Sequence, residues 1–405
     1  MTFFSLATFP ITSKKVFLRV DYNIFLSKRE PKDNYKIKQT IPTINFLLQK
    51  NCKIILATHL GRPNGKRVPE LTTKKLIPIL KKTFPRVPIN ALSDCIGKDV
   101  TSAILKGKQK SLFLLENLRF YKEEEENNNY FARELATLAD VYVNDAFGTL
   151  HRAHASVEAI THFLPSIPGF LVQHEVNELA RALEKSRQSI WIIGGAKIDK
   201  VDFFHTALQK AKYILVGGAL AFPFLRAKGI PIGMSRIDAA SINSAKKILK
   251  HKNASKIILP VDFHVAEKMT PNTPSLYVDY NQIQPHQIGL DLGPKTIARF
   301  KQYLRQADTI VWNGTLGYAE WAKFATATKE IGRFLGTLTA TTIVGGGETS
   351  EAMHTFHLAD KLTHVSTGGG AALDFLAGKK LPGLTALHNN YQHYKKKIHS
   401  QKSVI

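Results

Sequence analysis

The chain has 405 residues, which is too long for one ordinary hydrophobic core and fits two domains of usual size. Hydrophobic residues make up 44% and charged residues 22% of it, which excludes an intrinsically disordered chain. The formal net charge of +24 comes largely from scattered lysines, which is typical of a solvated surface, and no recognised nucleic-acid module accompanies it.

Short apolar runs alternate with longer amphipathic stretches along the chain. We predict strands at 16–20, 53–57, 112–115 and 141–143, and then at 190–193, 213–216, 256–261, 309–312, 341–344 and 363–366. These runs are almost wholly apolar, as in strands that are buried on both faces of a parallel sheet, and helical patterns lie between them. The sequence therefore predicts an α/β fold of two lobes, each a Rossmann-like parallel sheet flanked by helices.

A proline- and glycine-containing stretch at 164–169 marks the expected boundary between the lobes. After it, apolar residues recur at spacings of four, three and four, which predicts a long helix; they are Val172, Val176, Leu179 and Leu183. We expect domains at 1–168 and 187–381, an interdomain hinge helix at 169–186, and a C-terminal segment at 382–405. The last part of this segment, 391–405, is predicted to be a disordered basic tail.

In the first half, polar and charged residues follow the predicted strands. The cationic or potentially cationic ones are Arg19, His59, Arg62, Arg119, His151 and Arg152. Because the carboxyl ends of parallel strands meet at one edge of a sheet, we expect one cationic patch that binds a small anion. Asp21 and Asn23 are two residues apart, so they can face the same way and accept hydrogen bonds from hydroxyl groups. The alternative is that each arginine is an ordinary surface residue.

In the second half, glycines follow the strands instead; they are Gly194, Gly195, Gly217, Gly218, Gly345, Gly346 and Gly347. A strand, a glycine turn and a helix together make a cradle for phosphate, which predicts a nucleotide site. No GxxxxGK[ST] or full GxGxxG motif is present, and tight packing between strand and helix is the alternative. Glu348 follows the glycine triplet. Its carboxylate could hold Mg²⁺ that is bound to a phosphate, and the alternative is an acidic residue that stabilises the first turn of a helix.

One lobe for a small anion and one for a nucleotide together suggest phosphoryl transfer, with closure of the lobes excluding water. Several stretches, in order along residues 16–387, resemble the phosphoglycerate kinase family; they include HLGRP, ENLRF, NDAFGTLHRAH, DLGPKT, VWNG and IVGGGE. The resemblance implies transfer between 1,3-bisphosphoglycerate and ADP to give 3-phosphoglycerate and ATP, with Mg²⁺. It also implies a glycolytic monomer in which the segment from Pro382 returns to the first domain. Independently, the two isolated cysteines, Cys52 and Cys95, favour a reducing, cytoplasmic compartment, and the sequence has neither a long apolar run nor a nucleic-acid module that would indicate a membrane or nucleic-acid partner.

The resemblance also implies roles for residues that match the motifs of the family. On the glycerate side these are Asp21, Asn23, His59, Arg62, Arg119 and Arg152. On the nucleotide side they are Gly194, Gly195, Lys200, Gly217, Gly218, Asn313, Glu320, Gly345, Gly346, Gly347 and Thr349. The expected catalytic residues are Lys36, Lys197 and Lys200, and the expected magnesium ligand is Glu348.

The chain departs from the family pattern near the expected chemistry. Lys36 stands where the family has arginine, Lys197 and Lys200 are three residues apart instead of four, and Glu348 replaces an aspartate. An alternative is therefore a weakened or inactive member that acts as a binding or interaction protein, although the complete anion cluster favours an active kinase. A nucleic-acid or membrane-surface binder is a third hypothesis, which rests only on the net charge and the basic tail.

Overall fold

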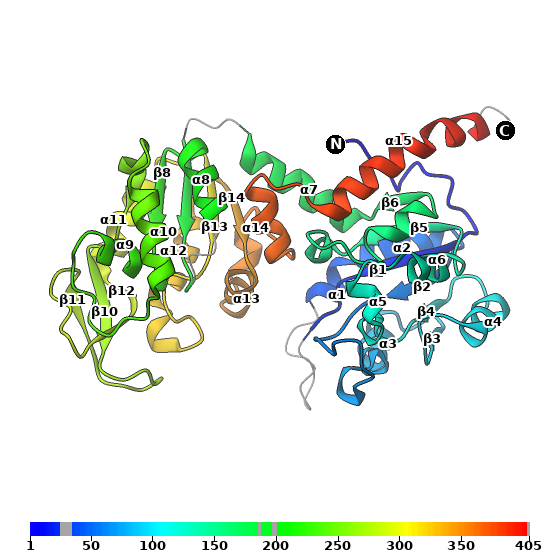
Figure 1. Cartoon of the computed structure of the whole chain (residues 1–405), viewed down its shortest axis with the longest axis horizontal. Coiled ribbons are helices and arrows are strands. Elements are labelled where there is room, and N and C mark those ends of the chain that lie inside the picture. The colour runs from blue at the N-terminus through cyan, green and yellow to red at the C-terminus, as the bar shows by residue number, and fades with distance from the viewer. Residues whose placement is uncertain (25–34, 185–187, 197–200, 403–405) are drawn as a thin grey trace. The chain divides into compact units, whose positions relative to one another are not determined.

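The computed structural model describes residues 1–24, 35–184, 188–196 and 201–402, without the side chains of Val201 and of residues 396–402. Its contacts divide the chain into two compact units (Figure 1). Unit 1 consists of Met1–Val176 and Lys380–Ile405, and unit 2 of Asn177–Lys379. The division falls inside helix α7, Phe170–Leu183, within the range predicted for an interdomain helix. That this helix acts as a hinge stays a prediction.

Unit 1 contains a six-stranded parallel sheet in its described part, in the order β3-β4-β2-β1-β5-β6. The strands are β1 Lys15–Val20, β2 Lys53–Ala57, β3 Ile89–Ala91, β4 Leu112–Leu114, β5 Val141–Asp145 and β6 Ser166–Pro168. The four predicted strands are present. The sequence analysis missed β3 and β6, which are only three residues long and lie at the two edges of the sheet.

Both faces of β1 are buried, and Arg19 lies on the face opposite to one hydrophobic core cluster of unit 1. Val16, Leu18 and Val20 belong to a buried cluster with side chains from the neighbouring strands and helices. Because side chains alternate along a strand, Phe17 and Arg19 point to the opposite face. The helices of unit 1 are α1 Tyr35–Gln39, α2 Ile41–Gln49, α3 Ile77–Thr83, α4 Lys98–Lys106, α5 Lys122–Glu125, α6 Asn129–Ala136 and α15 Pro382–Lys402.

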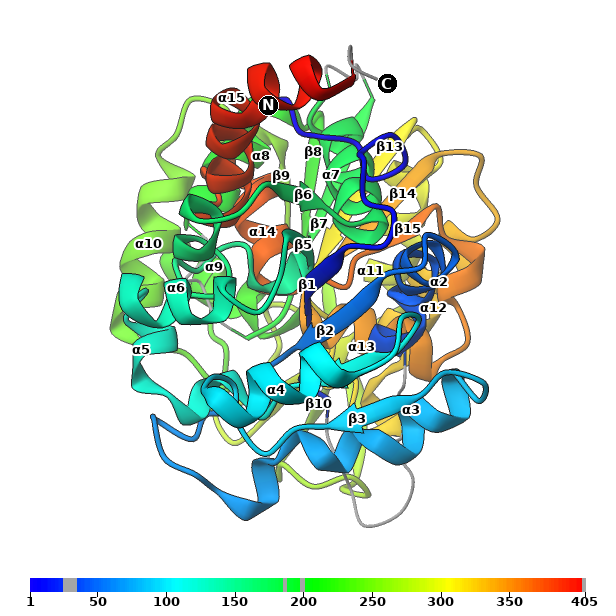
Figure 2. The same ribbon diagram turned by 90° about the vertical axis from the view of Figure 1, so that its right-hand side faces the viewer.

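Helix α15 packs beside the N-terminal segment, as both ribbon views show (Figures 1 and 2). The rings of Phe4 and Tyr391 are 4.9 Å apart, and His388 Nδ1 accepts a hydrogen bond from the backbone N of Thr2 at 3.1 Å. Tyr391 and Tyr394 also pack against the core cluster. The expected return of the C-terminal segment to the first domain therefore occurs, and the described part of the predicted basic tail is helical as far as Lys402.

Unit 2 contains a second six-stranded parallel sheet in its described part, in the order β15-β14-β13-β7-β8-β9. The strands are β7 Ser189–Ile193, β8 Tyr213–Val216, β9 Ile257–Ile258, β13 Thr309–Asn313, β14 Thr341–Gly345 and β15 His364–Val365. The helices are α8 Val201–Lys210, α9 Ala221–Ala227, α10 Ala239–Leu249, α11 Pro294–Leu304, α12 Thr326–Leu335, α13 Gly347–Thr355 and α14 Gly370–Leu376. Contacts divide these helices into one layer of α14, α8, α10 and α9 and another of α11, α12 and α13, on opposite sides of the strands (Figure 2).

The fold class of two lobes, each a parallel sheet flanked by helices, is confirmed, but unit 2 also holds an antiparallel sheet. Its strands, in the order β11-β10-β12, are β10 Asp262–Ala266, β11 Ser275–Asp279 and β12 Ile288–Leu292. The strand predicted at 256–261 is therefore wrong in extent, because β9 ends at Ile258. No helix in the described part of the chain is both long and apolar enough to cross a membrane.

Candidate active site

In each parallel sheet the strand order reverses between two central strands. In the first sheet β1 and β5 are neighbours: the chain passes from β1 to β2 on one side, and from β5 to β6 on the other. In the second sheet β7 and β13 are neighbours in the same way, with β8 beyond β7 and β14 beyond β13. Ligands of open α/β sheets bind outside the carboxyl ends of the strands at such a reversal. The segments that follow β1, β2, β4 and β5, and those that follow β7, β8, β13 and β14, contain nearly all of the predicted site residues.

The segment after β1 presents an acidic side chain that is paired with a lysine. Lys36 Nζ, on α1, lies 2.9 Å from Asp21 Oδ2 and 3.4 Å from the carbonyl oxygen of Asn23. Asn23 Oδ1 in turn accepts a hydrogen bond from the backbone N of Gly61 at 2.9 Å, which ties this segment to the loop after β2. Burial alone would raise the pKa of Asp21, but the nearby charge of Lys36 holds that pKa well below its usual range.

The imidazole of His59 lies behind this segment and contacts Arg19. Arg19 NH2 is 3.2 Å from His59 Nδ1, and both side chains are buried. Arg19 Nε donates to Ser156 Oγ at 2.8 Å, while the Ser156 hydroxyl donates to Glu124 Oε1 at 2.6 Å. Burial, followed by the charge of Arg19, lowers the pKa of His59 well below its usual value. Sequence analysis missed Ser156 and Glu124, because no strand ends next to either residue.

Arg119 brings the loop after β4 to the same cluster. Its NH1 donates to the carbonyl oxygen of Gly61 at 2.8 Å, and its Nε lies 3.1 Å from Glu125 Oε1, an ion pair without hydrogen-bond geometry. Burial and then the charges of Arg152 and Arg19 lower its pKa, while Glu125 opposes them. Electrostatic repulsion between these arginines is therefore appreciable, and an anion bound among them would relieve it.

Two further arginines follow the strands but are more accessible. Arg152 is half-buried and its Nε donates to His151 Nε2 at 3.1 Å, so His151 supports the arginine at this position. Arg62 is exposed and forms no hydrogen bond or ion pair with the described residues. The structure thus brings Arg19, Asp21, His59, Arg119 and Arg152 close enough for their charges to interact, whereas Arg62 is exposed and is not among the charges that act on them.

Asn117 holds the loop after β2 in place and was missed by the sequence analysis as a positioning residue. Its Oδ1 accepts from the backbone N of Leu60 at 3.2 Å and of Arg119 at 3.1 Å. Its Nδ2 donates to the carbonyl oxygens of Leu60 and Leu71 at 2.8 and 2.9 Å. This fully buried amide fixes the loops of His59 and Arg119 relative to each other. Its position inside the ENLRF stretch is the only signal that the sequence offered.

In unit 2, glycine turns from three strand ends meet at the strand-order reversal. Gly194 N donates to the Asn313 carbonyl at 2.8 Å, Gly195 N to the Thr315 carbonyl at 2.8 Å, and Gly218 N to the Leu316 carbonyl at 3.1 Å. A Cβ on Gly194 would lie 2.3 Å from the Thr315 oxygen, and a Cβ on Gly217 would lie 2.4 Å from Leu316. These glycines are therefore required for close packing of the turns, which was the alternative to a phosphate cradle in the sequence analysis. The packed turns also border a cavity.

That cavity, of about 370 Å³, lies over the loop between β14 and α13. It is lined by Gly195, Ala196, Asn313, Gly314, Gly346, Gly347, Glu348, Thr349, Gly369, Gly370 and Leu373. Gly346 has φ +93°, a conformation that favours glycine, and nothing lies within 4 Å of where a Cβ of Gly347 would be. Thr349 Oγ1 accepts a hydrogen bond from Gly314 N at 2.7 Å, so it joins the two loops. An open glycine backbone at the start of a nine-residue helix suits phosphate.

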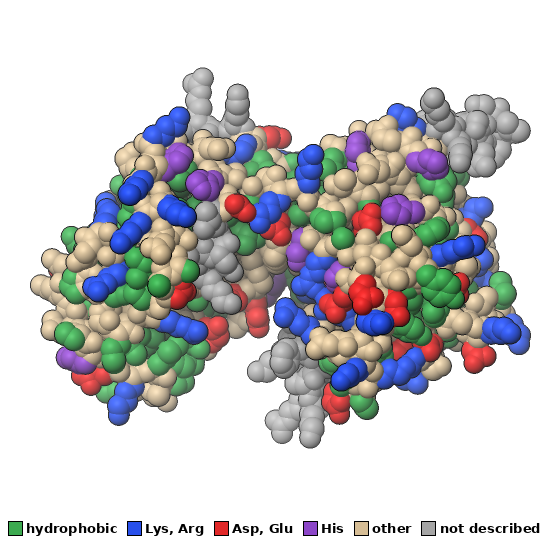
Figure 3. Space-filling view, in the orientation of Figure 1, with side chains coloured by type: hydrophobic (Ala, Val, Ile, Leu, Met, Phe, Trp, Pro, Cys, Tyr) green, Lys and Arg blue, Asp and Glu red, His purple; other side chains and the backbone are tan. Residues whose placement is uncertain are grey.

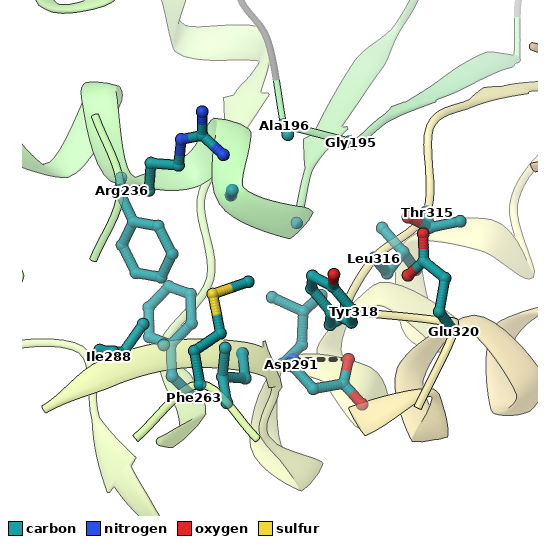
Figure 4. Close-up of a pocket in the computed structure, with 18 of the residues that line it drawn as sticks. Gly195, Ala196, Arg236, Phe263, Ile288, Asp291, Thr315, Leu316, Tyr318 and Glu320 are labelled. Carbon is teal, nitrogen blue, oxygen red and sulfur yellow. Dashed lines mark hydrogen bonds between the residues drawn. The ribbon is translucent and has the colours of Figure 1, made fainter. Parts of the chain in front are cut away.

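A second cavity, of about 260 Å³, adjoins the first through the shared residues Gly195, Ala196 and Glu348. Figure 4 shows Phe263, Ile288, Leu316 and Tyr318 around it, with Glu320 at one side and Arg236 at the other. An apolar slot with a few polar groups beside a phosphate cradle is suited to a nucleoside. Glu320 and Gly218 line this slot, and the contact of Glu320 with a ribose stays a prediction. The sequence analysis had not identified the apolar residues.

Asp291 lies at the floor of this slot, at the end of β12. Its carboxylate accepts from the backbone N of Leu292 at 2.9 Å and of Ala327 at 3.1 Å, the first of which is the dashed line in Figure 4. Burial raises the pKa of Asp291 to about 7. Because both oxygens are engaged by backbone, Asp291 shapes the slot rather than offering a free base.

Glu348 is the carboxylate of the phosphate-side cavity, and it is exposed without a hydrogen bond or ion pair to the described residues. The described residues contain no group of three or more His, Cys, Asp or Glu side chains that could hold a metal ion by themselves. Mg²⁺ on a nucleotide needs only one or two carboxylates in addition to phosphates and water, so Glu348 fits that role. The predicted catalytic residues Lys197 and Lys200 lie outside the described residues, directly after Ala196.

Comparisons with known proteins agree along the chain. A family model described as phosphoglycerate kinase matches residues 6–379. A phosphoglycerate kinase of Koribacter versatilis is 41% identical over 402 residues, covering 96% of this chain and 100% of that protein, and one of Pelotomaculum thermopropionicum is 42% identical over 386 residues, covering 93% and 97%. The phosphoglycerate kinase structure from Coxiella burnetii matches with TM-score 0.83 at 32% identity, and that from Pyrococcus horikoshii OT3 with TM-score 0.85 at 30% identity; each comparison covers 96% of this chain and 99% of the other.

Proposed function

This chain belongs to the phosphoglycerate kinase family, and on that premise we propose that it transfers a phosphoryl group between 1,3-bisphosphoglycerate and ADP. The observation that carries the proposal is the presence, in one chain, of a cationic cluster at the strand ends of unit 1 and a glycine-lined double cavity at those of unit 2. The first suits a small acid with a phosphate, and the second suits a nucleotide.

In unit 1 the substrate is a glycerate that bears a carboxyl group, a hydroxyl group and a phosphate. Arg119 and Arg152 supply the charge that its phosphate needs, with Arg62 and His59 as further donors. The ionised carboxylate of Asp21 and the amide of Asn23 accept and donate hydrogen bonds at the hydroxyl and carboxyl end. The hydrogen bond between Asn23 and Gly61 supports this assignment, because it holds the amide beside the cationic loops.

In unit 2 the nucleoside occupies the apolar slot, with Glu320 toward the ribose, and the phosphates lie over the turns of Gly195, Gly346 and Gly347. Glu348 would hold Mg²⁺, which neutralises phosphate charge when bound, and Thr349 keeps the loop in position. In the direction of ATP synthesis, an oxygen of the terminal phosphate of ADP bonds to phosphorus while the bond from phosphorus to the acyl oxygen breaks, which leaves a carboxylate. Since each unit holds one substrate, transfer requires the units to close and exclude water.

The ammonium group of Lys36, beside Asp21, supplies positive charge near the acyl end of the substrate. Lysine lacks the planar fork of arginine, so we expect activity, although slower than an arginine would give. The comparisons support this enzyme rather than an inactive relative. A monomer in the cytoplasm remains part of the proposal, which light scattering after size-exclusion chromatography and cell fractionation would test.

A coupled assay of ATP formation from 1,3-bisphosphoglycerate and ADP tests the proposal. We expect Mg²⁺-dependent turnover, which Arg119→Ala lowers by about 10²-fold or more in kcat/KM for the acid, because a charged contact to the anion is lost. Arg133→Ala, an exposed arginine on α6, is the matched control and should leave turnover unchanged. Folded protein that shows no turnover, or that is equally affected by both changes, would contradict the proposal.

A further inference from the structure

A chain of buried polar side chains runs behind the anion cluster of unit 1 and ends at His59. It begins at Glu124, on α5, whose side chain has no exposed surface. Glu124 Oε2 accepts from the backbone N of Ser156 at 2.9 Å, and its Oε1 accepts from the Ser156 hydroxyl at 2.6 Å. His154 Nδ1 lies 3.7 Å from the same Oε1. The hydroxyl hydrogen of Ser156 is therefore committed to Glu124, and its lone pairs are left to accept.

Arg19 uses those lone pairs and continues the chain. Its Nε donates to Ser156 Oγ at 2.8 Å, and its NH1 donates to the carbonyl oxygen of Val20. Its NH2 lies 3.2 Å from His59 Nδ1. Each guanidinium nitrogen thus has an acceptor, and the side chain is only 1% exposed. These contacts hold Arg19 in place. The nitrogen that remains for the anion cluster is NH2, which contacts His59.

The contact between Arg19 and His59 fixes which ring nitrogen carries the proton. A guanidinium group has donors and no acceptor, and it does not deprotonate in proteins. A favourable contact at Nδ1 therefore needs that nitrogen to be unprotonated, which leaves the single proton on Nε2. The surroundings of the ring also favour its neutral form. Burial and the charges of Arg19, Arg119 and Lys36 lower the pKa of His59, and only Asp21 opposes them by raising it.

We propose that Glu124, Ser156 and Arg19 are positioning residues that keep His59 as a neutral imidazole with its proton on Nε2, so that His59 offers the anion a hydrogen bond rather than a positive charge. A protonated ring would add a fourth cation to Arg19, Arg119 and Lys36, the three cations that act on it. The fixed neutral form instead adds a directed donor without that repulsion. The inference goes beyond the proposed function, and it rests on that function only for the identity of the anion.

The protonation state can be read directly by ¹⁵N NMR of the full chain labelled at histidine. His59→Gln identifies the resonances of His59 by their loss. Between about pH 6 and 8 we expect one unprotonated nitrogen coupled only to Hε1, which is Nδ1, and one protonated nitrogen coupled to both ring hydrogens, which is Nε2. Titration of the ring within this range, or the proton on Nδ1, would overturn the proposal. This measurement needs no turnover, so it remains decisive even if the enzyme assignment fails.

Substitutions in the chain Glu124–Ser156–Arg19, called the relay below, test the positioning role. Ser156→Ala should mix the two forms of the ring and raise KM for 3-phosphoglycerate by about three- to tenfold, as expected for one weakened hydrogen bond, with KM for ATP unchanged. Ser156→Thr keeps the hydroxyl group and should restore both readouts. Ser166→Ala, a buried serine in β6 that donates to Leu164, is the matched control and should change neither. If Ser156→Ala leaves the ring unchanged in a folded protein, the relay does not position it.

Two variants of His59 separate a hydrogen-bond donor from a charge. The amide of His59→Gln can reach the position of Nε2, whereas that of His59→Asn reaches only the position of Nδ1. We expect KM for 3-phosphoglycerate to rise about tenfold less in the first variant than in the second. The ratio of KM between His59→Gln and the unchanged protein should stay constant from about pH 6 to 8. Titration of the substrate phosphate affects both KM values equally, so it cancels from the ratio. A ratio that changes with pH would mean that His59 binds as a cation.

Discussion

The ammonium group of Lys36 serves two neighbours, Asp21 Oδ2 at 2.9 Å and the Asn23 carbonyl at 3.4 Å. It therefore both holds the acidic segment after β1 in place and supplies charge to the substrate. An arginine at this position could keep the contact with Asp21 through one nitrogen and offer a second donor to a phosphoryl oxygen. The side chain at this position is consequently expected to influence kcat as well as substrate binding.

We expect Lys36→Arg to raise kcat severalfold and Lys36→Ala to lower kcat/KM for the acid by about 10²–10³-fold, because the transition state loses a donor and Asp21 loses its partner. Steady-state kinetics with both substrates would measure these changes. Lys38→Arg, an exposed substitution on the same helix, is the matched control and should have no effect. An unchanged rate for Lys36→Ala would exclude a role for this lysine in the transfer step.

The sequence allowed prediction of those site residues that follow a strand directly. Asp21 and His59 lie at the carboxyl ends of β1 and β2, so the parallel-sheet prediction was enough to group them. Ser156 and Glu124 could not be found in this way, because their role depends on hydrogen bonds between distant positions: Arg19 donates to Ser156 across 137 positions, and Ser156 donates to Glu124 across 32. Their contact is a property of tertiary packing, which local patterns do not contain.

At the scale of elements, Pro260 explains the strand that was predicted with the wrong extent. Proline has no N–H to give to a β-ladder, so the apolar run 256–261 cannot continue as one central strand. β9 ends at Ile258, and the chain restarts at Asp262 as β10 in a different, antiparallel sheet. Because β11 and β12 carry mixed polar and apolar residues, the period alone did not distinguish them from loops.

The N-terminal end of α7 is held by Asp145, which is the last residue of β5. Its Oδ1 accepts from the backbone N of Leu171 at 2.9 Å and of Val172 at 3.4 Å. Burial raises the pKa of Asp145 to about 7, although these hydrogen bonds oppose the shift. A Cβ on Gly169 would lie 2.2 Å from the same oxygen, so the carboxyl group is tightly enclosed.

This enclosed carboxyl group predicts a pH dependence of stability. In the folded protein Asp145 binds its proton up to about pH 7, whereas the unfolded chain releases it near 3.8. The stabilising contribution is therefore complete below pH 3.8 and is lost as pH rises through 7. The asparagine of Asp145→Asn does not titrate, so this variant does not lose the contribution. The unfolding free energy of the variant minus that of the unchanged protein should therefore increase as pH rises, by at most about 4 kcal/mol. Urea unfolding at several pH values, compared with the exposed Asp99→Asn, would measure this gain, and a pH-independent difference would contradict the prediction.

At the scale of the whole molecule, each unit contains one candidate binding region, so the two ligands should stabilise different parts of the chain. Ligand at about a hundred times its Kd adds about 2.7 kcal/mol to the state that binds it. We expect 3-phosphoglycerate alone to slow amide hydrogen exchange at 57–62 and 117–121, and ATP with Mg²⁺ alone to slow it at 193–196 and 313–318. In Arg119→Ala only the first protection should disappear. Protection of unit 2 by 3-phosphoglycerate alone would reject the assignment of ligands to units.

The net charge of +24 was interpreted from the sequence as a solvated surface. On the face visible in Figure 3, Lys and Arg side chains lie scattered over both units, with acidic side chains among them. The charges that matter for the site are instead the few enclosed ones, such as Arg19 and Arg119. Composition therefore agrees with the face that is visible, whereas the chemistry required the positions of individual residues along the strands.

Unit 2 is a continuous insertion within the sequence of unit 1, because unit 1 combines Met1–Val176 with Lys380–Ile405. On a ribosome, the first part of unit 1 emerges before α15 has been made. Asn390, which accepts from Ser166 N at 2.8 Å, and Tyr391, which packs on the core, arrive only after all of unit 2. The first part of unit 1 must therefore wait for its last packing partner until the whole of unit 2 has been synthesised.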